Sequence, residues 1–305
     1  MSLPTKIKIV EVGPRDGLQN EATVIPTPVK LQLIEMLGEA GLSVIESTAF
    51  VSPKWVPQMA DQSEIMHGIL RRTGVAYPAL VPNQQGFEAA MAANCEEIAI
   101  FTAASESFCQ KNINCSIEES FSRFEPIIEA ALERGVKVRG YISCVLGCPY
   151  EGEVSPDAVE RVAVLMKGIG VDHCGVADTI GVGTPRRVQA AMERALKHFP
   201  IEEVSGHFHD TYGQALANIY ACLEMGIHTF DASVAGLGGC PYAKGATGNV
   251  ATEDVVFMLD GLGIQTGIAL DALVDAGAFI SEVLGRPPVS RAGKALLAKR
   301  EKVAA

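Results

Sequence analysis

His207 and His209 are the two residues whose type and spacing point most directly to chemistry. They lie at what the pattern predicts to be the end of a short strand. Alternate strand residues face the same side, so both imidazoles would project together while Phe208 faces the other way. Two adjacent imidazoles form half of a metal site. The alternative is one buried structural histidine beside one exposed histidine, and the rest of the chain bears on that choice.

Short apolar, β-branched runs alternate with longer amphipathic runs, and this order positions the histidines. The apolar runs predict eight strands, at residues 7–12, 44–48, 76–81, 98–102, 136–144, 174–177, 204–208 and 229–233. The amphipathic runs predict helices such as 27–40, 118–134, 156–168, 185–198 and 214–224. Start and stop signals support them, with a capping box at Ser116 and Glu119 and glycine stops at Gly41, Gly135, Gly170 and Gly226.

Eight strands, each followed by a helix, within about 250 residues are typical of an α/β fold of the (β/α)8, or TIM-barrel, kind. An open doubly wound sheet is the alternative, but the turn at 13–17 lacks the G-x-G-x-x-G pattern of dinucleotide-binding sheets. Further helices are predicted near 252–262 and 269–284. We therefore expect a single domain over 1–305, with the barrel at about 7–262 and a C-terminal helical extension at about 263–305.

Polar residues follow the predicted strands where each strand ends, which is where such barrels carry their sites. Arg15 and Asp16 follow the first strand, and His207 and His209 end the seventh. A ligand set of Asp16, His207 and His209, with Asn249 as a weaker fourth, would leave positions for a chelating substrate. Oxygen and nitrogen ligands without a thiolate favour Mg²⁺ or Mn²⁺, with zinc as an alternative. We count His207 among the catalytic candidates as well as among the ligands.

Four further residues are candidates for moving or stabilising charge. Arg15 could stabilise a developing oxyanion or enolate, and a salt bridge to a neighbouring carboxylate such as Glu46 is its alternative role. Glu46 and Asp178 could orient the ligands or accept protons, and their alternatives are a structural ion pair and a helix N-cap. Cys240 lies in the glycine-rich segment 236–242, where an exposed thiol could act as an acid–base group or a nucleophile.

The net charge limits the classes of binding partner, and the cysteine content indicates the cellular compartment. The 305 residues carry a net charge of −11 without a basic stripe or tail, which argues against a nucleic acid or an anionic membrane as partner. No apolar run reaches the roughly 18 residues of a membrane span, and the start shows no signal-peptide pattern. The eight cysteines form no C-x-x-C pair, so we expect reduced thiols in a cytoplasmic protein.

Five segments together resemble the signatures of one enzyme family. They are 11–21, which reads Glu-Val-Gly-Pro-Arg-Asp-Gly-Leu-Gln-Asn-Glu, then 143–152, 178–185, 209–214 and the cysteine loop 233–243. Over about residues 7–285 the chain is similar to the 3-hydroxy-3-methylglutaryl-CoA (HMG-CoA) lyases. The cysteine loop is the most specific segment, because the wider superfamily of metal-dependent acyl-CoA barrels shares the Arg-Asp turn and the paired histidines but not this loop.

The resemblance implies a lyase that cleaves (S)-HMG-CoA to acetyl-CoA and acetoacetate, acts in leucine breakdown and forms a homodimer. It implies that the four ligands named above hold a divalent cation and that Arg15 stabilises the enolate of acetyl-CoA. Cys240 would be the acid–base residue of a mobile loop, with Glu46 and Asp178 supporting the site. Ala22 stands where many members have lysine, so one cationic contact near the CoA phosphates is missing.

Other functions stay open at this point. A lyase for a bulkier 3-substituted glutaryl-CoA would need the same residues, and a synthase condensing acetyl-CoA with a 2-oxo acid would share the Arg-Asp turn and paired histidines. A zinc hydrolase would need a third strong ligand, and a non-catalytic CoA-binding or metal-binding protein would be expected to lack one of the chemical residues. From the sequence alone, Arg15→Gln is expected to abolish nearly all turnover with little loss of folding.

Overall fold

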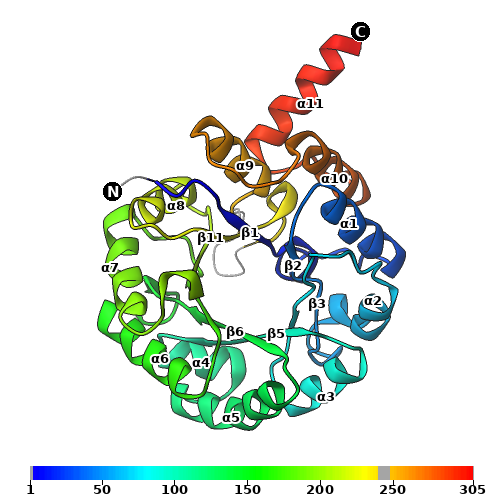
Figure 1. Ribbon diagram of the computed structural model, residues 1–305. Helices are drawn as coiled ribbons and strands as arrows, with labels where there is room; N and C mark the ends of the chain where they lie inside the picture. The colour runs from blue at the N-terminus through cyan, green and yellow to red at the C-terminus, as the bar shows by residue number, and fades with distance from the viewer. Residues whose placement is uncertain (1–2, 240–247, 305) are drawn as a thin grey trace.

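Parallel strands form the wall of a barrel in the computed structural model, which describes residues 3–239 and 248–304 (Figure 1). The sheet order is β2-β1-β11-β10-β9-β6-β5-β4-β3. The strands are β1 Lys8–Glu11, β2 Val44–Ile45, β3 Thr48–Ala49, β4 Ala79–Leu80, β5 Glu97–Ala103, β6 Lys137–Ser143, β9 His173–Asp178, β10 Val204–Phe208 and β11 Thr229–Ala232. The predicted (β/α)8 fold is confirmed, since each predicted strand overlaps a strand of this wall.

The segment from β2 to β3 closes the barrel. Sequence analysis predicted one strand at 44–48, whereas the structure splits it at Glu46 and Ser47. The N–H of Glu46 donates to the carbonyl of Glu11 at 2.8 Å, and the N–H of Ser47 donates to the carbonyl of Pro78 at 2.9 Å. β2 pairs with β1 and β3 pairs with β4. This one segment therefore joins the two ends of the sheet order.

Helices surround the wall (Figure 1). They are α1 Thr27–Glu39, α2 Gln62–Gly68, α3 Gln84–Ala92, α4 Glu106–Ile113, α5 Ile117–Glu133, α6 Pro156–Gly168, α7 Pro185–Leu196, α8 Ala215–Glu224, α9 Thr252–Gly261, α10 Leu270–Val283 and α11 Arg291–Ala304. α10 lies beside α1, and α11 extends away from the barrel as the predicted C-terminal helical addition (Figure 1). None of the helices in the described ranges combines the length and apolar composition needed to span a bilayer.

Local sequence signals fix several helix ends as expected. The Ser116 hydroxyl accepts from the N–H of Glu119 at 3.1 Å, and the Glu119 carboxylate accepts from the N–H of Ser116 at 2.7 Å, which completes the capping box of α5. Gly170 and Gly226 follow α6 and α8 with φ of 88° and 89°, a region that side chains with a Cβ rarely adopt. Sequence analysis did not name the short α4, or the hairpin of β7 Gly147–Cys148 and β8 Gly152–Glu153.

The barrel has an apolar outside and a mixed inside. Phe87, Phe199 and Phe208 are fully buried in the core cluster that also holds the apolar helix residues. A separate apolar cluster consists of Val10, Val12 and Val44 with Ala76 against it. Buried polar side chains are also present on the wall, among them Arg139, Ser205 and Asp231. Phe208 thus packs into the core while its neighbours in sequence serve the site, as the strand alternation predicted.

Candidate functional site

A cavity of about 230 Å³ lies where the wall strands end. Its lining comes from the segments after β1, β9 and β10, from β4, β5 and β6, and from α4. The lining residues are Arg15, Asp16, Gln19, Asn20, Leu80, Phe101, Phe108, Asn112, Tyr141, Ser143, Ala177, Thr179, His207, His209 and Gly239. Arg15, Asp16, His207 and His209, which sequence analysis predicted to lie at this rim, all line the cavity. The predicted site residues Asn249, Glu46 and Asp178 are not among its lining residues.

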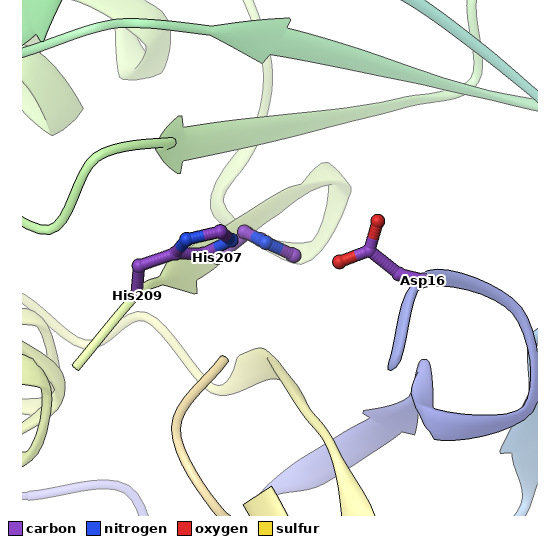
Figure 2. Close-up of side chains that lie close together, drawn as sticks. All are labelled: Asp16, His207 and His209. Carbon is purple, nitrogen blue, oxygen red and sulfur yellow. The ribbon is translucent and has the colours of Figure 1, made fainter. Parts of the chain in front are cut away.

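Asp16, His207 and His209 meet at one point of this cavity (Figure 2). Each offers one ligand atom, and these atoms all lie within 4.8 Å of one another. The two imidazole rings have centroids 5.4 Å apart. Asp16 comes from the π-helical turn η1 Gly13–Gly17 directly after β1, while His207 lies in β10. Within the described residues, this is the one group of three or more such side chains close enough to hold a metal ion.

His207 is oriented by Asp231, a residue that sequence analysis missed. Nδ1 of His207 lies 3.1 Å from Oδ2 of Asp231, whose side chain is fully buried. The two residues are register partners on β10 and β11. Burial lowers the pKa of His207, but the hydrogen bond and charge of Asp231 and the charge of Asp16 outweigh it, so the pKa is raised. A carboxylate on Nδ1 favours the Nδ1–H tautomer and leaves Nε2 free to bind a cation.

His209 and Asp16 carry the charge states that a metal site needs. Burial and the neighbouring His207 lower the pKa of His209 to about 4, so its imidazole is neutral at pH 7. Burial raises the pKa of Asp16, but the charges of Arg15, His207 and His209 outweigh it and hold that pKa far below its usual value. Nδ1 of His209 is buried and has no hydrogen-bond partner among the described residues. One carboxylate and two imidazoles, one of which has an unpaired buried ring nitrogen, fit a divalent cation.

Asn249 reaches the same place from the other end of the sequence. Its Nδ2 donates to Oδ2 of Asp16 at 2.8 Å. The segment is held there by the N–H of Asp210, which donates to the carbonyl of Gly248 at 2.7 Å, and by the N–H of Val250, which donates to the carbonyl of Phe208 at 3.1 Å. The structure therefore brings all four predicted ligands together, with Asn249 in contact with one of them.

Arg15 lies between two carboxylates. Nε and Nη2 contact Oε2 of Glu46 at 2.8 and 2.7 Å, and Nη1 contacts Oδ1 of Asp16 at 2.7 Å. Burial lowers the pKa of Arg15, but the charges of Glu46 and Asp16 outweigh it and raise the pKa, so the guanidinium stays charged. The ion pair weighed as an alternative role is therefore present. Arg15 also lines the cavity. The same guanidinium can therefore form the ion pair with Glu46 and stabilise a developing negative charge in the cavity.

The other catalytic candidates differ in position. Glu46 is buried against Arg15 and is not part of the cavity lining. Asp178 is fully buried, and its carboxylate accepts from the N–H of Val182 at 3.2 Å and of Gly183 at 2.7 Å. These bonds cap the turn after β9, and Asp178 is not among the residues that line the cavity. Its role as a proton acceptor stays a prediction. Cys240 lies outside the described residues.

Comparison with known proteins identifies the family of this chain. The HMGL-like family model matches residues 6–280. The chain belongs to the HMGL-like family. It is 56% identical over 294 residues to the mitochondrial hydroxymethylglutaryl-CoA lyase of Rattus norvegicus, covering 96% of this chain and 90% of that protein. It is 58% identical over 299 residues to the 3-hydroxy-3-isohexenylglutaryl-CoA/hydroxymethylglutaryl-CoA lyase of Pseudomonas aeruginosa, covering 98% and 100%.

Solved structures agree with the sequence relatives. The crystal structure of the hydroxymethylglutaryl-CoA lyase from Pseudomonas aeruginosa superposes with a TM-score of 0.96 at 58% identity, covering 98% of this chain and all of that one. An HMG-CoA lyase from Acinetobacter baumannii, in complex with coenzyme A and 3-methylmalate, superposes with a TM-score of 0.92 at 36% identity, covering 97% and 96%. The resemblance read from the five sequence segments is thereby confirmed.

Proposed function

We propose that this protein is a divalent-metal-dependent carbon–carbon lyase that cleaves (S)-HMG-CoA to acetyl-CoA and acetoacetate. The observation that carries the proposal is the meeting of Asp16, His207 and His209 in a cavity that Arg15 also lines. The family membership and the names of relatives that are 56% and 58% identical support the same reaction. The lyase complex with coenzyme A supports an acyl-CoA substrate.

The cleaved bond joins C2 and C3 of the substrate. A base of the enzyme takes the proton of the C3 hydroxyl, C3 becomes the ketone carbon of acetoacetate, and the bonding electrons pass to C2 as the enolate of acetyl-CoA. Protonation at C2 then completes acetyl-CoA. Asp16, His207 and His209, with Asn249, would hold the divalent cation. When bound, such a cation polarises the oxygens it contacts and lowers the pKa of a hydroxyl group.

Two residues of the chain act on the negative charge that develops on the substrate. Arg15 remains cationic and lines the cavity, so it can stabilise the enolate oxygen, and such a donor contributes roughly 10²–10³-fold to the rate. Cys240 lies outside the described residues, and the resemblance of the cysteine loop 233–243 supports its thiol as the group that donates a proton to C2. Mg²⁺ or Mn²⁺ is proposed as the cation, because the ligand set is oxygen and nitrogen without sulfur.

A bulkier substrate is the second candidate. The Pseudomonas aeruginosa relative carries both activities in its name. In this chain Leu80, Phe101 and Phe108 give the cavity an apolar side that an alkyl substituent at C3 could contact. Comparing kcat/KM for HMG-CoA and for the isohexenyl analogue separates the two. A higher value for the analogue would move the assignment to the bulkier substrate.

The reaction itself is tested by acetoacetate release. The purified chain is incubated with (S)-HMG-CoA and Mg²⁺ or Mn²⁺, against an EDTA control. Product that depends on added metal supports reaction, substrate and cofactor class together. No acetoacetate from either cation, despite measurable metal binding, would overturn the HMG-CoA assignment. The homodimer and the cytoplasmic location belong to this proposal and are checked by light scattering and by cell fractionation.

A further inference from the structure

Glu11 is a buried carboxylate that the proposed mechanism does not use. It is the last residue of β1 and has no exposed surface. It opens the segment 11–21 that carries Arg15 and Asp16, yet nothing in that resemblance gives it a role. Oε1 accepts from the N–H of Gly13 at 2.8 Å and from the N–H of Val234 at 2.8 Å, while Oε2 accepts from the Thr252 hydroxyl at 2.6 Å.

Each of those three partners lies close in sequence to a residue of the site or of the cavity lining. Gly13 is the first residue of η1, which carries the metal-binding turn. Val234 is the first residue of the turn η4 Val234–Gly236, after which Gly239 lines the cavity. Thr252 begins α9, three residues beyond Asn249. One carboxylate thus joins segments that are 223 and 241 residues away from it in the sequence.

A fourth segment meets the backbone of the same residue. The carbonyl of Glu11 accepts from the N–H of Glu46, the partner of Arg15, at 2.8 Å. The space around the carboxylate is also tightly filled. A Cβ added at Gly13 would lie 2.6 Å from Oε1 of Glu11, so this glycine leaves the room that the carboxylate occupies.

We propose that Glu11 is a positioning residue that sets the relative placement of the turn carrying Asp16, the loop entered at Val234 and the segment carrying Asn249. The inference rests on the proposed function only for the identity of the cation site. A buried acceptor that satisfies two N–H groups and one hydroxyl leaves those groups orphaned when it is removed. Metal ligands shift when the groups that orient them are lost, typically with a 10–100-fold loss of affinity.

The test compares three variants of the full chain by their Kd for Mn²⁺, measured by electron paramagnetic resonance at a temperature where circular dichroism shows each variant folded. Glu11→Gln keeps an oxygen for both N–H groups and an amide donor for Thr252, so its Kd should stay within about 3-fold of wild type. Glu11→Asp is one methylene shorter and cannot reach all three partners, so its Kd should rise about 10–100-fold.

Glu253→Asp is the matched control, because it shortens an equally buried carboxylate by the same one methylene. The Glu253 carboxylate accepts from the N–H of Ala235 at 2.9 and 3.0 Å, and no second segment bonds to it among the described residues. The Kd of this variant for Mn²⁺ should stay within about 3-fold of wild type, which separates the positioning role of Glu11 from the general effect of shortening a buried acid.

The outcomes distinguish the positioning role from the lyase assignment. A folded Glu11→Asp with wild-type affinity, or a Glu11→Gln as impaired as Glu11→Asp, would overturn the positioning role while leaving the lyase assignment standing. A wild-type chain that binds Mn²⁺ but releases no acetoacetate would overturn the HMG-CoA assignment, and the three affinities would still decide the role of Glu11. A wild-type chain that binds no Mn²⁺ would overturn both.

Discussion

Replacing Arg15 by glutamine tests the charge-stabilising role of this residue, and the structure changes what the variant should do. Sequence analysis predicted loss of turnover with little loss of folding. The structure changes the second half of that expectation, because Arg15 is the partner of Glu46, whose side chain is 1% exposed. Removing one member of a buried ion pair leaves an uncompensated charge, which costs about 3–5 kcal/mol.

The design that separates folding from catalysis is a pair of variants. Arg15→Gln should lower the free energy of unfolding by about 3 kcal/mol and kcat by roughly 10²–10³-fold. Arg15→Gln/Glu46→Gln removes the buried charge as well, so most of the lost stability should return while kcat stays low. Arg72→Gln is the control, since Arg72 pairs with Glu39, which is 57% exposed, and should change neither quantity.

The assays are urea unfolding followed by circular dichroism and acetoacetate release at saturating HMG-CoA and Mn²⁺. A double variant that regains kcat along with stability would show that Arg15 serves folding alone. A single variant as stable as wild type would refute the ion-pair argument.

Three further changes probe the surroundings of the site. Asp231→Asn removes the carboxylate that fixes the tautomer of His207, so the Kd for Mn²⁺ should rise about 10–100-fold in a calorimetric titration, and an unchanged Kd would count against that role. Asn249→Ala removes the amide that donates to Asp16, so the affinity for Mn²⁺ should fall in the same titration. An unchanged affinity would contradict a role for Asn249 in the cation site. Burial raises the pKa of Glu253 from 4.5 to about 8, so its contribution to stability is present below pH 4.5 and is lost as the pH rises through 8. Glu253→Gln should therefore lose less stability than wild type between pH 5 and 8 in denaturant titrations, and identical pH profiles would contradict this.

The barrel and the cation site could be predicted from the sequence because both rest on local patterns. Each wall strand is an apolar run bounded by turn signals, and the polar residues directly after it must lie at one rim. His207 and His209 carried the clearest signal, since strand alternation alone orients both rings. The short α4 and the hairpin of β7 and β8 were not predicted, because eight residues and two residues give too little periodicity to recognise.

The contacts between distant segments could not be predicted, because they depend on the register between strands. Asp231 meets His207 since Gly206 lies opposite Phe230 and His207 opposite Asp231 on neighbouring strands. Glu11 meets Thr252 across 241 residues of sequence. Asp178 was placed correctly at a strand end, and its carboxylate accepts from the N–H groups of Val182 and Gly183, a capping role close to the N-cap that the sequence offered as an alternative.

Titrating metal-free protein with Mn²⁺, while occupancy and acetoacetate release are followed together, shows whether the reaction needs the metal that these side chains hold. Turnover should rise in step with one-to-one occupancy, and His209→Ala should move both curves to higher Mn²⁺ concentration by the same factor. Turnover that persists in EDTA, or a His209→Ala variant in which the two curves separate, would contradict the claim that these side chains hold the metal that the reaction needs.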